Sequence, residues 1–267
     1  MAVAKRRTCK VQPIVGHFRH LDLFSGIGGF ALAAEAAGWN TVGFAEVDDY
    51  ASRVLKRHWP DVPNYGDVRN VPAMPVDLVT GGFPCQPFSL AGKRAGTADD
   101  RYLWPEMLAV VRRCRPAWVL GENVPGIIGM GLDSCLSDLE GYGYTCQAFC
   151  IPACAVGAGH RRQRIWIVAH TERDSVQGGA SESEERLDEC GKEQLARLLQ
   201  SCARPSLSSA RAYGKDYGVW QRVDGVQRNK SCGNAIVPQV AYPLLRWMRA
   251  GLCTANAENQ ALTRERQ

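Results

Sequence analysis

Short apolar runs alternate with helical stretches from residue 20 to residue 169, and this alternation constrains the fold of the 267-residue chain more than any other feature. The predicted strands are HLDLF (20–24), TVGFAE (41–46), VDLVTGG (76–82), AWVLGEN (117–123), TCQAF (145–149) and RIWIVA (164–169). The predicted helices are 28–38, 50–59, 103–116 and 132–143. Strands that alternate with helices in this way form βαβ units, with a parallel sheet covered on both faces. Because such crossovers are right-handed, we expect a doubly wound, mostly parallel α/β sheet of Rossmann type.

The alternation stops after the sixth run, and the composition then changes twice. Residues 170–230 are rich in Ser, Gly, Glu, Arg and Gln, which predicts a small and partly disordered insert lobe. Residues 231–251 predict a glycine turn and an amphipathic helix that returns to the main domain. We therefore expect a basic tail (1–19), a cofactor-binding and catalytic domain (20–169), the insert, the returning segment and a polar tail (252–267).

Composition narrows the class of protein. With 45% hydrophobic and 22% charged residues, the chain has the make-up of a globular domain. No apolar run approaches the roughly 20 residues that cross a bilayer, and the basic N-terminus has no apolar signal region, so we expect a cytoplasmic protein. The 11 cysteines are then expected to be free thiols. The net charge of +5 includes basic segments, which fit either a polyanionic partner or a solvated surface.

The stretch DLFSGIGGF (22–30) predicts a strand, a glycine turn and a helix. Gly26 allows a tight turn, while Gly28 and Gly29 let backbone N–H groups approach a ligand at the helix N-terminus. Glu46 ends the second strand, where it can accept hydrogen bonds from ribose hydroxyls. Asp67 is expected at a further strand tip, where it can accept one from an adenine amino group. An adenosine-containing cofactor fits this arrangement; NAD remains an alternative, although its G-x-G-x-x-G fingerprint is not matched.

The loop GGFPCQPFS (81–89) places Cys85 after a strand, at the carboxyl edge of the sheet, where ligands bind. A thiol there is either a nucleophile or a small apolar residue. Glu122 ends the neighbouring strand, so it is either a proton donor with a raised pKa or a helix cap. Arg162 and Arg164 are two residues apart at the start of another strand, so both side chains are expected on one face, unless the stretch is simply solvated.

In this order, DLFSGIGGF, FAEVD, GDV, GGFPCQPFS, ENVPG, RRQR and CGNAIVPQVA resemble the motifs of DNA (cytosine-5) methyltransferases, especially small bacterial and phage members. The resemblance covers residues 20–169 and 231–250. It implies methylation of carbon 5 of a flipped cytosine in double-stranded DNA, with S-adenosylmethionine as cofactor. It also implies Cys85 as the nucleophile that forms a covalent adduct, Glu122 as partner of the base, and Arg162 and Arg164 as orienting residues.

The resemblance also implies a set of residues around the cofactor. They are Phe24, Ser25, Gly26, Ile27, Gly28, Gly29, Glu46, Val47, Asp67, Val68, Pro84 and Asn234. Two rivals stay open: a methyltransferase of cytosine in RNA, which shares the fold, and a DNA-binding relative without catalysis.

Three further segments carry expectations. His160 stands where the family usually has Gln, and barely 60 residues are left for target recognition, so we expect a short or degenerate target or contacts borrowed from a partner or second copy. Residues 89–101 are predicted to close over DNA as a lid. No metal site is expected: the C-x₃-C-x₃-C series of Cys146, Cys150 and Cys154 is interrupted by proline, so core cysteines are the better account.

Overall fold

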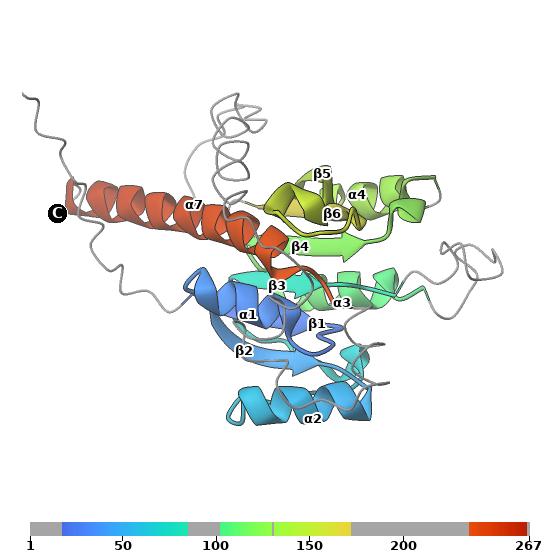
Figure 1. Ribbon diagram of the computed structural model, residues 1–267. Coiled ribbons are helices and arrows are strands. Elements are labelled where there is room, and N and C mark those ends of the chain that lie inside the picture. The colour runs from blue at the N-terminus through green and yellow to red at the C-terminus, as the bar shows by residue number, and fades with distance from the viewer. Residues whose placement is uncertain (1–17, 85–101, 130, 172–234, 266–267) are drawn as a thin grey trace, which may run out of the picture.

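The computed structural model describes residues 18–84, 102–129, 131–171 and 235–265, with only the helical backbone given for 253–265 (Figure 1). The predicted alternation is confirmed, and the strands and helices expected by residue range between residues 20 and 169 lie within a few residues of those bounds. The strands are β1 (Arg19–Leu23), β2 (Asn40–Ala45), β3 (Leu78–Gly81), β4 (Trp118–Asn123), β5 (Thr145–Pro152) and β6 (Gln163–His170). The α-helices are α1 (Gly29–Ala36), α2 (Asp49–His58), α3 (Trp104–Cys114), α4 (Leu132–Glu140) and α7 (Pro238–Glu265). The short 3₁₀ helices are η1 (Val68–Asn70), η4 (Pro125–Gly129) and η5 (Ala153–Val156).

The six strands form one sheet in the order β2-β1-β3-β4-β6-β5. Strands β1 to β4 are parallel, so the doubly wound, mostly parallel α/β sheet is confirmed. Strand β6 is antiparallel to both of its neighbours and lies between β4 and β5. Its first residues therefore lie beside the carboxyl end of β4, with Glu122 opposite Trp166.

The side chains of the strands alternate between two apolar layers. Leu21, Val79 and Val119 face α3 and α4, whereas Leu78, Leu120 and Trp166 face α1 and α7. Figure 1 shows α1 and α7 lying along the same face of the sheet. Each large side chain buried in these layers stabilises the fold by about 1.5–3 kcal/mol, so the two layers hold the strand ends in place.

Helix α7 is longer than the sequence predicts. It continues to Glu265 instead of ending at residue 251, so the predicted polar tail begins inside a helix. Good helix formers, namely Ala and the polar residues Glu, Gln and Arg, dominate this part and propagate a helix without needing a wide apolar face. Gly251 lies against the sheet, where a Cβ would make an ordinary van der Waals contact, 3.5 Å from the Trp118 ring. None of the described helices is apolar enough over a sufficient length to span a membrane.

A buried row of polar side chains crosses the first three strands of the sheet. The two ring nitrogens of His20 lie 3.0 Å from the hydroxyl of Thr41 and 2.8 Å from the hydroxyl of Thr80. Thr80 in turn donates a hydrogen bond of 2.9 Å to Asp22. Burial lowers the pKa of His20 to about 3 and raises the pKa of Asp22 to about 8. The row ties β2, β1 and β3 together directly before the predicted cofactor turn.

Gly28 gives a direct test of how this turn packs. Its φ of +88° suits glycine, and a Cβ would lie within 2.6 Å of the Trp59 ring. Gly66 also has a positive φ, but no described atom lies within 4 Å of a Cβ there. We expect Gly66→Ala to lower the free energy of unfolding by about 1–2 kcal/mol, the cost of the left-handed conformation. Gly28→Ala should cost about 1–3 kcal/mol more, because Trp59 must move.

Urea unfolding of the two variants and the parent measures both costs. Equal losses in the two variants would show that Trp59 yields without cost and would contradict the packing described here.

Candidate functional site

The predicted cofactor turn is a strained loop at the carboxyl end of β1. Phe24, Gly26 and Gly28 all have positive φ, and Phe24 adopts this conformation without being glycine. The turn is held by hydrogen bonds from the Ser25 hydroxyl to the Asp22 carbonyl (2.7 Å) and from the Gly28 N–H to the Ser25 carbonyl (2.9 Å). Among the described residues no side chain caps α1 at Gly28, so backbone N–H groups at the helix N-terminus are available to bind a ligand there.

Glu46 fastens this turn to the end of β2. One carboxylate oxygen accepts the N–H of Gly26 at 2.7 Å, and the other accepts the N–H of Asp48 at 2.8 Å. Each oxygen keeps a lone pair that can accept a ribose hydroxyl. The next residue, Val47, leaves 70% of its surface exposed, which offers an apolar contact beside the carboxylate. Ile27, by contrast, is buried against α2, so only its backbone faces the turn.

The predicted strand before Asp67 is wrong, because a single bridge between Phe44 and Asn64 stands in its place. Asp67 instead caps η1, where its carboxylate accepts the Arg69 N–H at 2.9 Å and pairs with the Arg69 guanidinium at 3.1 Å. Gly66, at φ +69°, turns the chain immediately before it, which ends any extended strand. Val68 is buried beneath.

Asn64 is a site residue that sequence reasoning missed. Its side-chain oxygen accepts the N–H groups of Glu46 (3.0 Å) and Gly66 (3.1 Å), and its amide donates to the Glu46 carbonyl. These bonds bring the segments of Glu46 and Asp67 side by side even without a third strand. The only signal in the sequence is the N-Y-G turn pattern that precedes Asp67.

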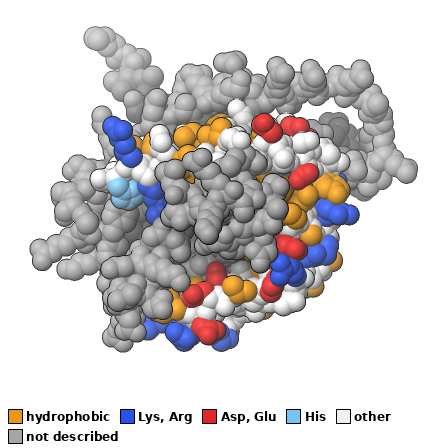
Figure 2. All heavy atoms as spheres, turned by 90° about the vertical axis from the view of Figure 1, so that its right-hand side faces the viewer, with side chains coloured by type: hydrophobic (Ala, Val, Ile, Leu, Met, Phe, Trp, Pro, Cys, Tyr) orange, Lys and Arg blue, Asp and Glu red, His pale blue; other side chains and the backbone are white. Residues whose placement is uncertain are grey.

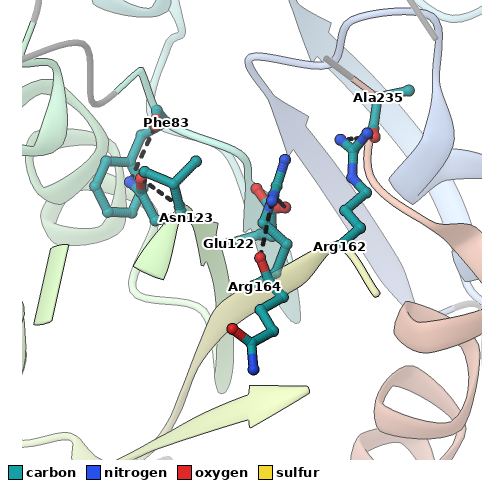
Figure 3. A network of polar contacts seen from close by, with 8 residues as sticks. Phe83, Glu122, Asn123, Arg162, Arg164 and Ala235 are labelled. Carbon is teal, nitrogen blue, oxygen red and sulfur yellow. Dashed lines mark hydrogen bonds and ion pairs between the residues drawn. The ribbon is translucent and has the colours of Figure 1, made fainter. Parts of the chain in front are cut away.

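Glu122 lies at the end of β4 and is buried, with 8% of its surface exposed. The Arg164 guanidinium lies 3.0 Å from its carboxylate, so the structure brings these two predicted site residues together (Figure 3). Burial raises the pKa of Glu122 to about 7, although the charges of Arg164 and Arg162 act in the opposite direction. Near neutral pH the carboxyl group therefore exists in both forms and can donate a proton.

Arg162 precedes β6 and has a different partner. It adopts a φ of +24°, and its guanidinium donates a hydrogen bond of 2.6 Å to the backbone carbonyl of Ala235. Figure 3 shows Arg164 directed at Glu122 and Arg162 directed at Ala235. The prediction placed both side chains on one face of a strand, but Arg162 precedes β6, and the two arginines bind different segments of the chain.

The loop that leads toward Cys85 passes Glu122. A Cβ on Gly82 would lie 3.6 Å from a carboxylate oxygen of Glu122. Phe83 is buried, its carbonyl accepts the Asn123 side-chain amide at 3.1 Å, and its ring lies 5.2 Å from that of Trp104. Pro84 is the last residue described before the loop segment that begins with Cys85. Cys85, the predicted lid (89–101), Asn234 and the predicted insert from residue 172 onward lie outside the described residues.

Figure 2 views the edge toward which β1 to β4 run, and its described part mixes acidic, basic and apolar side chains. The described residues include no group of three His, Cys, Asp or Glu side chains that could hold a metal.

The expectation of core cysteines is wrong for Cys150 and Cys154, which are exposed, while Cys146 is half-buried. Strand β5 is at the sheet edge, and a helical turn follows it, which leaves these thiols in solvent.

Comparison with known families gives one match that covers most of the chain. The model of the C-5 cytosine-specific DNA methylases matches residues 18–217. Among curated proteins, Type II methyltransferase M.HgiCII of Herpetosiphon aurantiacus is 37% identical over 183 residues, covering 64% of this chain and 42% of its own length. Type II methyltransferase M2.BsuMI of Bacillus subtilis is 34% identical, and the match covers 58% of this chain and 42% of the length of that relative. The chain thus spans less than half the length of these relatives.

Solved structures give the same fold at low sequence identity. The S. pombe Dnmt2 methyltransferase superposes with a TM-score of 0.63 at 17% identity, over 88% of this chain and 99% of its own. A putative DNA modification methyltransferase encoded within an E. coli prophage gives 0.59 at 18% identity, over 87% and 99%.

The buried carboxyl of Glu122 makes a prediction about stability and pH. Because its pKa rises from 4.5 to about 7 on folding, the folded chain holds a proton in this range that the unfolded chain releases. Its contribution is fully present below pH 4.5 and is lost as the pH rises through 7. Between pH 4.5 and 8, the unfolding free energy of the parent should fall by about 3 kcal/mol relative to Glu122→Gln.

Urea unfolding at several pH values measures this difference, with Glu140→Gln, an exposed carboxyl on α4, as the control that should follow the parent. Parallel curves for the parent and Glu122→Gln would contradict the raised pKa.

Proposed function

The chain belongs to the family of C-5 cytosine-specific DNA methylases, and on this premise we propose that it transfers a methyl group from S-adenosylmethionine to carbon 5 of cytosine in double-stranded DNA. The named relatives are Type II methyltransferases, so we further propose that the chain is the modification enzyme of a restriction-modification pair and works in the cytoplasm.

The observation that carries the proposal is the buried Glu122–Arg164 pair beside the loop that leads to Cys85. A protonated carboxyl can donate a hydrogen bond to ring nitrogen 3 of a cytosine that has left the duplex. Flipping the base costs roughly a few kcal/mol, and a desolvated site strengthens the polar contacts that compensate for it.

Carbon 5 of cytosine is too poor a nucleophile to take a methyl group directly, so an enzyme nucleophile must first add to the ring and activate it. In the proposal, the Cys85 thiolate adds to carbon 6, and Glu122 assists by hydrogen bonding or protonating nitrogen 3. The new bond places electron density on carbon 5, which takes the methyl group from the sulfonium and leaves S-adenosylhomocysteine as the other product. A base then takes the proton from carbon 5, elimination breaks the bond to sulfur and releases the Cys85 thiolate, and nitrogen 3 returns its proton to Glu122. Arg164 fixes the Glu122 carboxyl in position throughout.

The turn fits the cofactor that this chemistry needs. S-adenosylmethionine supplies an electrophilic methyl group on a sulfonium. The N–H groups at the start of α1 suit its carboxylate, and the free lone pairs of Glu46 suit its ribose hydroxyls. Val47 offers an exposed apolar surface for the adenine ring, and each oxygen of Asp67, which accepts one hydrogen bond from Arg69, keeps a lone pair for the adenine amino group.

Covalent trapping tests the function. We expect the parent to form a denaturation-resistant adduct with mixed-sequence duplex DNA containing 5-fluorocytosine when S-adenosylmethionine is present. Fluorine at carbon 5 blocks the final elimination, so the bond to sulfur persists. Cys85→Ser should form no adduct, whereas Cys150→Ser, which removes an exposed thiol on β5, should trap like the parent.

Failure of the parent to trap would remove the mechanism. Transfer of a tritiated methyl group to transfer RNA in place of duplex DNA would instead favour the RNA enzyme.

Target length can be tested separately. The segment between β6 and the returning α7 is short for base readout, which requires side chains on a stable element. Bisulfite sequencing of DNA from cells that express the chain should show methylation at a short or degenerate site. A long unique recognition sequence would contradict this proposal.

A further inference from the structure

Residues Ala235 and Ile236, which precede α7, lie where the two halves of the proposed site meet. A Cβ on Gly29, at the start of α1, would lie 3.0 Å from Cγ1 of Ile236. A Cβ on Gly82, in the loop after β3, would lie 3.8 Å from Cγ2 of the same side chain. Ile236 is itself buried. One isoleucine therefore packs against both the cofactor turn and the loop beside Glu122.

Arg162 holds this segment from the other side. Its hydrogen bond of 2.6 Å to the Ala235 carbonyl is the only one that the described part of the chain gives its guanidinium. Its Nε is buried and has no partner among the described residues. Burial lowers the pKa of Arg162, and the nearby Arg164 lowers it further. The charge of Glu122 acts in the opposite direction, and the hydrogen bond to Ala235 is the contact that fixes the direction of this guanidinium.

We infer that Arg162 is a positioning residue for the cofactor, acting through Ala235 and Ile236, whereas Arg164 acts on Glu122. The inference rests on the proposed function and divides between the two arginines a role that the family resemblance assigns to both. Losing the bond from Arg162 releases Ile236 from Gly29, which loosens the turn that receives the cofactor. Losing the bond from Arg164 leaves that turn in place and disturbs the carboxyl group.

The experiment separates cofactor affinity from turnover in five full-length variants. Calorimetry gives Kd for S-adenosylhomocysteine, and methyl transfer to unmethylated DNA of mixed sequence gives kcat at saturating S-adenosylmethionine. The variants are Arg162→Ala, Arg162→Lys, Arg164→Lys, Ile236→Ala and the control Arg161→Ala. Arg161 is an exposed neighbour whose described contact is made by its backbone carbonyl.

We expect Arg162→Ala to raise Kd about tenfold to a hundredfold, the range for losing a hydrogen bond to a charged group. Ile236→Ala should raise it in the same direction, and Arg162→Lys should recover part of the loss. Arg164→Lys should leave Kd within twofold of the parent and lower kcat. Arg161→Ala should bind like the parent.

An unchanged Kd in Arg162→Ala, or an equal loss of affinity in Arg164→Lys, would overturn the inference that the two arginines have separate roles. Thermal unfolding identifies a variant that does not fold, and Ile236→Val, which removes a single methyl group, then replaces Ile236→Ala with a smaller rise expected. A parent that binds no S-adenosylhomocysteine would refute the proposed function itself, whereas a binding parent with unchanged variants would refute only the role of Arg162.

Discussion

A carboxyl group buried at the end of β4 is the constraint on which the rest of this site depends. Glu122 is tolerated there because Arg164 reaches it from the adjacent strand. That approach requires β6 to be antiparallel to β4, since a parallel strand would bring its first residues to the opposite end of the sheet. The direction of one strand thus decides whether an arginine and a carboxylate that lie 42 positions apart in the sequence can meet.

The cofactor side is built in a different way, from backbone conformations rather than from buried charge. Phe24, Gly26 and Gly28 turn the chain sharply through their positive φ angles. The turn keeps its shape because Glu46 accepts a hydrogen bond from it and Ile236 packs against its last glycine. Both supports come from distant segments. The turn is therefore preorganised by tertiary contacts, which lowers the entropy that a ligand must overcome on binding.

Periodicity was sufficient to predict the strands and helices between residues 20 and 169, because short apolar runs alternate there with stretches of helical spacing. It was not sufficient to order them. Nothing in RIWIVA indicates that this strand inserts between β4 and β5, since that choice depends on which neighbours bury its two apolar faces. The prediction for Asp67 was wrong because a single bridge and the hydrogen bonds of Asn64 replace the expected strand.

For individual site residues too, local patterns predict the position along the chain, whereas the contacts depend on how the strands and distant segments pack. Glu122 and Arg164 were each predicted at a strand end, but their pairing depends on the position of β6 in the sheet. The bond from Arg162 to Ala235 likewise joins distant segments whose proximity no local pattern indicates. The exposure of Cys150 also depends on sheet order, because an edge strand loses the cover that an inner strand would have. The roles of Cys85 and Asn234 stay predictions.

The protonation of Asp22 decides the order of the hydrogens in the buried row from Thr41 to Asp22. When Asp22 is ionised, Thr80 donates its one hydroxyl hydrogen to Asp22, so Nε2 of His20 carries the ring hydrogen and Nδ1 accepts from Thr41. When Asp22 is protonated, its own O–H can donate to Thr80, and Thr80 can then donate to His20. With the pKa of His20 near 3 and that of Asp22 near 8, both side chains are mainly uncharged at neutral pH. A ligand bound at the turn above this row therefore meets no full charge from these four side chains.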